Sequence, residues 1–139
     1  MRFWDSSALV AVCVEEPNTS SVRRMLRDDP GVVAWWGSPV ECWSAFTRLR
    51  REGVISPEGE EDARRVLDRL GGSWTEILPS GELRRDAGRL VRIHPLRAGD
   101  ALQLAAALTW ASSPLAGEIV AFDERLRDAA RLEGLTPVP

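Results

Sequence analysis

The sequence predicts an α/β protein with a mostly parallel central sheet of four to five strands and helices on both faces. Short apolar runs that favour β-structure occur at 3–4, 32–36, 74–78 and 118–122. Segments with apolar residues at helical spacing lie between these runs, and such alternation is typical of a parallel sheet covered on both sides. The chain has 139 residues, 44% of them hydrophobic. This size and composition predict one domain over 1–139 with a proper core.

Composition and charge exclude several classes of protein. No apolar run is long enough to cross a membrane. Asp5 and Glu15 interrupt any signal-peptide core, so we expect a cytoplasmic protein. Cys13 and Cys42 form no C-x-x-C pair and are expected to be buried free thiols. Net charge is −3, but all 18 basic residues are Arg, which leaves either a local phosphate-binding surface or coding bias as the explanation.

The first strand is followed at once by an acidic residue. Residues 3–4 predict a short buried strand and residues 8–14 a packed helix, with Ser6 and Ser7 as N-caps. Asp5 then stands at the carboxyl end of the strand, the edge where open α/β sheets bind ligands. A role as an N-cap is the alternative interpretation of Asp5, and both remain open here.

The second strand, 32–36, is followed by a second acidic residue. Gly37 ends the strand, and Ser38 with Pro39 predicts a helix that runs to about Arg51. Glu41 lies in the first turn of this helix, a position like that of Asp5. Ser38 and Glu41 also fit the S-x-x-E capping box, which is the alternative role. The residues expected on one side of this helix are Val40, Trp43, Phe46 and Thr47.

The middle of the chain supplies further helices and the third strand. A helix capped by Asn18 or Thr19 is expected to reach about Arg27, and others to cover about 57–70 and 80–93, around the strand at 74–78. Their expected inward residues are Ala63, Val66, Leu67, Leu70, Leu83, Ala87, Leu90 and Val91.

Two more carboxylates follow the same rule. Asp100 lies near the start of a very apolar helix that Ser112-Ser113-Pro114 should end, so it is either a cap or a site residue. Asp123 comes directly after the strand at 118–122 and precedes another helix, which repeats the arrangement at Asp5. A final edge strand is expected at 135–138, because Pro137 keeps it out of the sheet interior.

The other catalytic groups are few. The chain has one His, no Tyr and no Lys, and it lacks a G-x-S-x-G elbow, a P-loop and G-x-G-x-x-G. Parallel strands end at one edge of the sheet, so two or more of the four carboxylates are expected to converge and to raise each other's pKa by repulsion. With no Lys and no obvious Arg neighbour, a divalent cation such as Mg²⁺ or Mn²⁺ is the expected counterion. Such an ion can activate water without a catalytic His.

The ordered motifs D-S-S-A-L-V, S-P-V-E, H-P-L-R-A-G-D-A-L-Q-L-A-A-A and A-F-D-E-R-L resemble those of the PIN-domain ribonucleases, in particular VapC toxins of bacterial toxin–antitoxin pairs. The resemblance covers essentially the whole chain. It implies a Rossmann-like PIN domain in which Asp5, Glu41, Asp100 and Asp123 are the catalytic, metal-binding quartet. It also implies an endoribonuclease that uses Mg²⁺ or Mn²⁺, cuts RNA, forms a homodimer and is inhibited by a VapB-type antitoxin. Many relatives have Ser or Thr where this chain has Ala121.

Rival interpretations differ in what they require. A phosphotransfer receiver domain needs an acidic pair after the first strand and a Lys, and this chain has neither. A DNA-directed nuclease of the same fold, or a catalytically silent PIN-like binding module whose acids are only caps, stays open. Arg48, Arg50 and Arg51 either contact phosphate or form a solvated face. Trp43 belongs either to the core or to a dimer face, and His94 is expected to be a loop residue.

Overall fold

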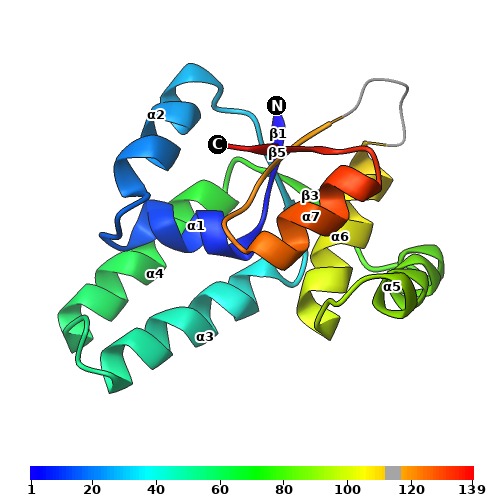
Figure 1. Cartoon of the computed structure of the whole chain (residues 1–139). Helices are drawn as coiled ribbons and strands as arrows, with labels where there is room; N and C mark the ends of the chain where they lie inside the picture. The colour runs from blue at the N-terminus through cyan, green and yellow to red at the C-terminus, as the bar shows by residue number, and fades with distance from the viewer. Residues whose placement is uncertain (112–116) are drawn as a thin grey trace.

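The computed structural model describes residues 1–111 and 117–139 (Figure 1). The predicted helix end at Ser112-Ser113-Pro114 lies outside these residues. The elements, in chain order, are β1 Arg2–Trp4, α1 Ser6–Cys13, α2 Thr19–Asp28, β2 Val32–Trp35, α3 Ser38–Arg51, α4 Pro57–Gly71, β3 Thr75–Ile77, α5 Gly81–Ile93, α6 Ala98–Trp110, β4 Glu118–Val120, α7 Glu124–Leu132 and β5 Thr136–Val138.

The five strands form one parallel sheet in the order β3-β2-β1-β4-β5. The predicted α/β class with a parallel sheet of four to five strands is confirmed. The chain leaves β1 toward β2 on one side and later returns to β4 on the other. The sheet therefore reverses its strand order between β1 and β4, and open α/β sheets bind ligands at the carboxyl ends of the strands at such a point.

Helices cover both faces of the sheet, as Figure 1 shows. Successive side chains of a strand point to opposite faces, so Phe3 packs with α5, α6 and α7 while Trp4 packs with α1 to α4. Both aromatic side chains are fully buried. Burying a large aromatic side chain contributes about 1.5–3 kcal/mol, so these two residues anchor β1 between the two helical layers.

The structure corrects several expected boundaries and faces. Asp5, and not Ser6 or Ser7, is the N-cap of α1. The strands end at Trp35 and Val120, slightly earlier than predicted. Two residues expected to point inward, Val40 and Val91, are 59% and 44% exposed. Val40 lies in the first turn of α3, beyond the carboxyl end of β2.

The edge strand β5 is found at Thr136–Val138, and it pairs only with β4 within the described residues. This position suits Pro137, which has no N–H to donate to a second neighbour. Cys13 and Cys42 are free thiols, as expected, but only Cys42 is buried, while Cys13 is partly exposed. In the part of the chain that the structure describes, no helix combines the length and the apolar character that a membrane crossing needs.

Candidate functional site

A cleft of about 330 Å³ lies at the carboxyl edge of the sheet, next to the point where the strand order reverses. All four carboxylates singled out in the sequence line it: Asp5, Glu41, Asp100 and Asp123. They come from the end of β1, the first turns of α3 and α6, and the residue before α7. The parallel topology thus brings together acids that are up to 118 positions apart in the sequence.

Asp5 is the most buried of these acids, with 4% of its surface exposed. Its Oδ2 accepts hydrogen bonds from the backbone N of Ser7 at 3.0 Å and from the Ser7 hydroxyl at 2.6 Å. Burial raises the pKa of the Asp5 carboxyl to about 6, the charges of Glu41 and Asp100 add to the rise, and the bonds from Ser7 oppose it. Asp5 is therefore both a helix cap and a carboxylate of the cleft, so the two interpretations are compatible.

Glu41 is not part of a capping box. The N-cap of α3 is Gly37, Ser38 is already helical, and the Ser38 hydroxyl accepts a hydrogen bond from the side chain of Gln103. The Glu41 carboxylate instead accepts from Ser6 Oγ at 2.9 Å and from Gln103 Nε2 at 3.2 Å. Burial raises its pKa, and Asp100 adds to this effect while the two hydrogen bonds oppose it.

The carboxylate of Glu41 faces the first turn of α6. A Cβ placed on Gly99 would lie 3.8 Å from Glu41 Oε2, which is ordinary van der Waals contact. Asp100 follows in the same turn, and its Oδ2 accepts from the backbone N of Arg97 at 3.3 Å. Burial raises the pKa of Asp100, the bond from Arg97 opposes it, and the charge of Asp123 raises it further.

Asp123 repeats the arrangement of Asp5 at the next helix. It is the N-cap of α7, and its Oδ1 accepts from the backbone N of Leu126 at 2.9 Å. The two caps are linked, because Ser7 Oγ accepts a hydrogen bond from the backbone N of Phe122 at 3.1 Å. The methyl group of Ala121 is fully buried. The Ser7 hydroxyl therefore joins the backbone after β4 to the carboxylate of Asp5.

Basic side chains lie at and near the cleft, although no Arg neighbour was obvious from the sequence. Arg48 lines it, and the charges of Arg97 and Arg125 act on the carboxyl of Asp100. None of these three guanidinium groups forms an ion pair with a residue that the structure describes. Arg50, by contrast, pairs with Glu60. The cleft thus has an acidic floor and unpaired basic groups around it.

The donor set suits a hard divalent cation. All four candidate ligands are carboxylates, and oxygen ligands are those that Mg²⁺ and Mn²⁺ prefer. Three of the carboxyls have raised pKa values, so a nearby positive charge would stabilise their ionised forms. In the side-chain arrangement of residues 1–111 and 117–139, no three His, Cys, Asp or Glu side chains are spaced to hold one metal ion. Binding of one ion by three of these acids would therefore require some of their side chains to turn.

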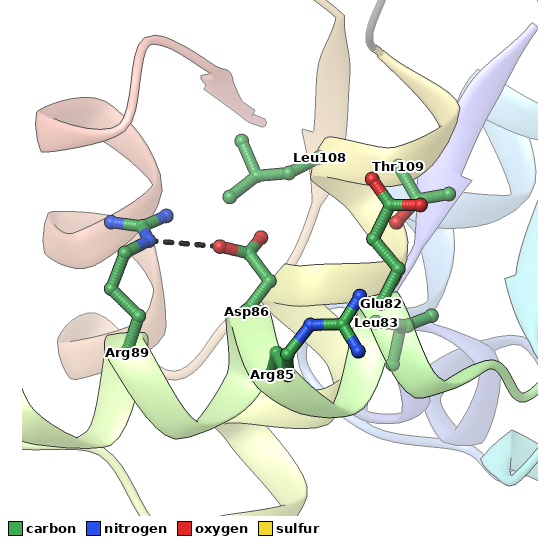
Figure 2. A pocket seen from close by; sticks show the side chains of 7 residues that line it. All are labelled: Glu82, Leu83, Arg85, Asp86, Arg89, Leu108 and Thr109. Atoms are coloured by element: carbon green, nitrogen blue, oxygen red, sulfur yellow. Dashed lines mark hydrogen bonds and ion pairs between the residues drawn. The ribbon is translucent and has the colours of Figure 1, made fainter.

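A larger cavity, of about 570 Å³, lies between α5 and α6 (Figure 2). Leu108 and Thr109 line it, about 12 Å along α6 from Asp100. In its lining, Arg89 forms an ion pair with Asp86 at 2.8 Å, which Figure 2 shows. Arg89 also pairs with Glu133. His94 lies outside the acidic cleft as well, ends α5 and contacts Glu133 at 2.7 Å.

Sequence reasoning missed Gln103 and the pairing role of Ser7. Gln103 is fully buried within an otherwise apolar stretch of α6. A lone amide inside an apolar helical run was the available signal, because a buried amide needs hydrogen-bond partners. For Ser7, no sequence pattern distinguishes a hydroxyl that bridges two strand ends from an ordinary cap.

Comparison with known proteins agrees with this architecture. The profile of the PIN domain matches residues 2–132. Among solved structures, the crystal structure of VapC20 from Mycobacterium tuberculosis, described as a sarcin–ricin loop cleaving toxin, superposes with a TM-score of 0.69 at 18% sequence identity. The match covers 93% of this chain and 95% of that one. No curated protein sequence matches the chain significantly.

Proposed function

Since the chain belongs to the PIN-domain family, we propose that it is a metal-dependent endoribonuclease and a toxin of the VapC type. The observation that carries this proposal is the cleft at the carboxyl edge of the sheet, which Asp5, Glu41, Asp100 and Asp123 all line. None of these four forms an ion pair with a residue that the structure describes. Similarity in fold to VapC20, a toxin described as cleaving the sarcin–ricin loop, supports RNA as the substrate.

The proposed metal ligands are Asp5, Glu41, Asp100 and Asp123, and the ion is Mg²⁺ or Mn²⁺. When bound, such an ion supplies a hydroxide nucleophile near neutral pH and neutralises charge on the phosphate. The chain's own groups prepare the ligands for it. Ser7 donates two hydrogen bonds to Asp5, which favours the ionised carboxylate despite burial. Ser6 and Gln103 hold both oxygens of Glu41.

Arg48, Arg97 and Arg125 are the proposed contacts to the RNA backbone. Guanidinium groups bind phosphate as planar forks, and these three have no competing ion pair among the described residues. Arg48 lies on α3 and Arg125 on α7. Replacing Arg48 by Ala is expected to raise KM for RNA and reduce its salt dependence, and an unchanged KM would exclude a phosphate contact there.

The test of the proposed function is digestion of labelled RNA and single-stranded DNA, side by side, by the purified protein. We expect cleavage of RNA with Mg²⁺ or Mn²⁺ and none with EDTA. Cleavage of DNA in preference to RNA would favour a DNA-directed nuclease of the same fold. Absence of any cleavage, together with binding of an antitoxin, would identify a silent binding module. Activity that survives full chelation would remove the metal from the mechanism.

We also propose a VapB-type antitoxin as partner and a homodimer as the assembly. An acidic floor favours an antitoxin that places Arg or Lys near Asp5 and Asp123. Undiminished inhibition after removal of every basic residue in the antitoxin's C-terminal half would contradict this. The dimer is supported by three exposed apolar side chains near the ends of β2 and β3, namely Trp36, Val40 and Leu78. Sedimentation as a monomer would overturn it.

A further inference from the structure

Gln103 is a polar side chain in an apolar environment. Its side chain is fully buried, and its buried neighbours on α6 are Ala101 and the run from Leu104 to Ala107. It lies three residues after Asp100, so both residues occupy the same side of α6. Burying an amide is unfavourable unless its polar atoms are hydrogen-bonded. The contacts of this amide therefore indicate why it is there.

The amide nitrogen of Gln103 makes two hydrogen bonds, and both cross to the first turn of α3. Nε2 donates to Ser38 Oγ at 3.0 Å and to Glu41 Oε1 at 3.2 Å. The carbonyl Oε1 is buried and has no donor among the described residues. An apolar side chain of equal length would fill the same space without an unpaired oxygen. Packing alone does not account for this amide.

The bond to Glu41 gives the amide a defined task. Ser6 donates to Oε2 of Glu41 from α1, and Gln103 donates to Oε1 from α6. The two donors fix the orientation of the carboxylate from both sides. Each oxygen keeps a further lone pair, so the carboxylate remains able to bind a cation.

We propose that Gln103 is a positioning residue that holds the Glu41 carboxylate in place for the divalent cation, in register with Asp100 on the same helix. The inference rests on the proposed function only in taking Glu41 as a metal ligand. Groups that orient metal ligands in this way commonly change metal affinity by about 10–100-fold when they are removed.

The experiment measures Mn²⁺ affinity directly, by titration followed with electron paramagnetic resonance, so it does not depend on RNA cleavage. Gln103→Met keeps the length and apolar character of the site and removes the donor. We expect about tenfold weaker Mn²⁺ binding with a melting temperature in EDTA close to that of the parent, because the variant also removes the unpaired oxygen. Parent-like Mn²⁺ binding would overturn the proposal.

Ser38→Ala is the matched control, because it removes the other partner of the same amide and leaves the bond to Glu41. Its Mn²⁺ affinity should stay within about twofold of the parent. Glu41→Gln completes a double-mutant cycle with Gln103→Met. If Gln103 acts through Glu41, the second substitution adds little to the loss caused by the first. An equal loss in both backgrounds would assign Gln103 a merely structural role and overturn the proposal.

Gln103→Leu provides a second variant if Gln103→Met does not fold. The two proposals fail in different ways. A parent that binds Mn²⁺ but cuts no RNA would contradict the proposed ribonuclease, while the affinity of the Gln103 variants would still decide the positioning role. A parent that binds no Mn²⁺ would overturn both.

Discussion

Two glutamates, Glu41 on α3 and Glu60 on the neighbouring helix α4, differ in the charge of the groups around their carboxylates. Glu60, on α4, accepts a hydrogen bond from Thr47 at 2.8 Å and forms ion pairs with Arg50 and Arg64. The Thr47 hydroxyl, followed by the two guanidinium groups, lowers the pKa of Glu60. Glu41, in the first turn of α3, accepts only from the neutral donors Ser6 and Gln103 among the described residues, and burial raises its pKa.

The difference separates a structural carboxylate from one that is available to a ligand. The negative charge of Glu60 is already compensated by residues of the chain, and the contact joins α3 to α4. Among the described residues, Glu41 has no ion pair that compensates its charge, and neither have Asp5 and Asp100 nearby. A cation from outside the chain would therefore bind more favourably at the cleft than at Glu60. By the same reasoning Glu133 is a structural carboxylate like Glu60, because it contacts Arg89 and His94.

The largest expected effect is the loss of RNA cleavage when Glu41 is exchanged for its amide, and Glu60 serves as the comparison. Glu41→Gln should lower the rate of RNA cleavage by roughly 100-fold or more, since loss of a metal ligand should exceed the 10–100-fold cost of losing a group that orients one. Asp5→Asn and Asp100→Asn should behave alike. Glu60→Gln should cleave RNA at the parental rate although it melts at a lower temperature. The measurement is initial cleavage rate with saturating Mg²⁺, and a Glu41→Gln variant as active as the parent would contradict the assignment.

The second prediction concerns pH and uses Asp5. Its folded pKa of about 6 lies above the ordinary value of 3.8, so its contribution to stability is present below about pH 4 and is lost as pH rises to about 6. One pKa unit is worth about 1.4 kcal/mol, so the loss amounts to at most about 3 kcal/mol. Chemical unfolding of the metal-free protein between pH 4 and 7 measures it, and Asp5→Asn should flatten this decline.

Glu60 is the control, because its pKa is shifted in the opposite direction to that of Asp5. Its lowered folded pKa gives stability that is present above its unfolded pKa and lost as pH falls through the folded value. Glu60→Gln should therefore leave the decline between pH 4 and 6 intact and reduce the acid sensitivity below that range. An Asp5→Asn variant whose stability changes from pH 4 to 6 in the same way as that of the parent would show that burial does not raise the pKa of Asp5.

The fold was predictable because the period of the sequence changes along the chain. The β-favouring runs and the apolar helical stripes give the strands, the helices and the parallel class. Exact ends were less predictable. Asp5 replaced Ser6 and Ser7 as the N-cap of α1, because three adjacent residues all have capping side chains. Val40 and Val91 fit a helical stripe but are exposed in the structure, and the sequence does not state which helix faces remain uncovered.

The site was predictable as a set of acids and less so in its electrostatics. The sequence placed four carboxylates at equivalent positions of the α/β pattern, and parallel topology explains why these positions share an edge. Repulsion was the expected cause of their raised pKa values. Burial is the larger cause for Asp5, Glu41 and Asp100, since solvent exclusion depends on packing that no local pattern encodes. The same limit applies to Arg48, whose position in the cleft depends on how α3 packs.

The smallest expected effect is the gain in stability from Mg²⁺. Thermal melting with EDTA and with Mg²⁺ measures this gain, and it compares variants of the cleft with a variant of Glu60. A ligand that binds only the folded protein stabilises it by about 2.7 kcal/mol at a hundredfold excess over its dissociation constant. For a domain of this size the parent's Tm should rise by roughly 10 °C relative to EDTA. Glu60→Gln should melt below the parent in EDTA and gain the same from Mg²⁺, since its carboxylate is already paired with Arg50 and Arg64.

Asp100→Asn is the decisive variant in that comparison. It removes a half-buried charge that the neighbouring acids disfavour, while the amide oxygen of Asn can still accept from the backbone N of Arg97. In EDTA it should therefore be at least as stable as the parent, and it should gain clearly less from Mg²⁺ because a ligand is lost. A parent whose Tm ignores Mg²⁺, together with an Asn variant that is less stable in EDTA, would mean that Asp100 serves only as a cap of α6. Glu41 would then differ from Glu60 in lacking ion pairs with Arg, and not in its availability to a metal.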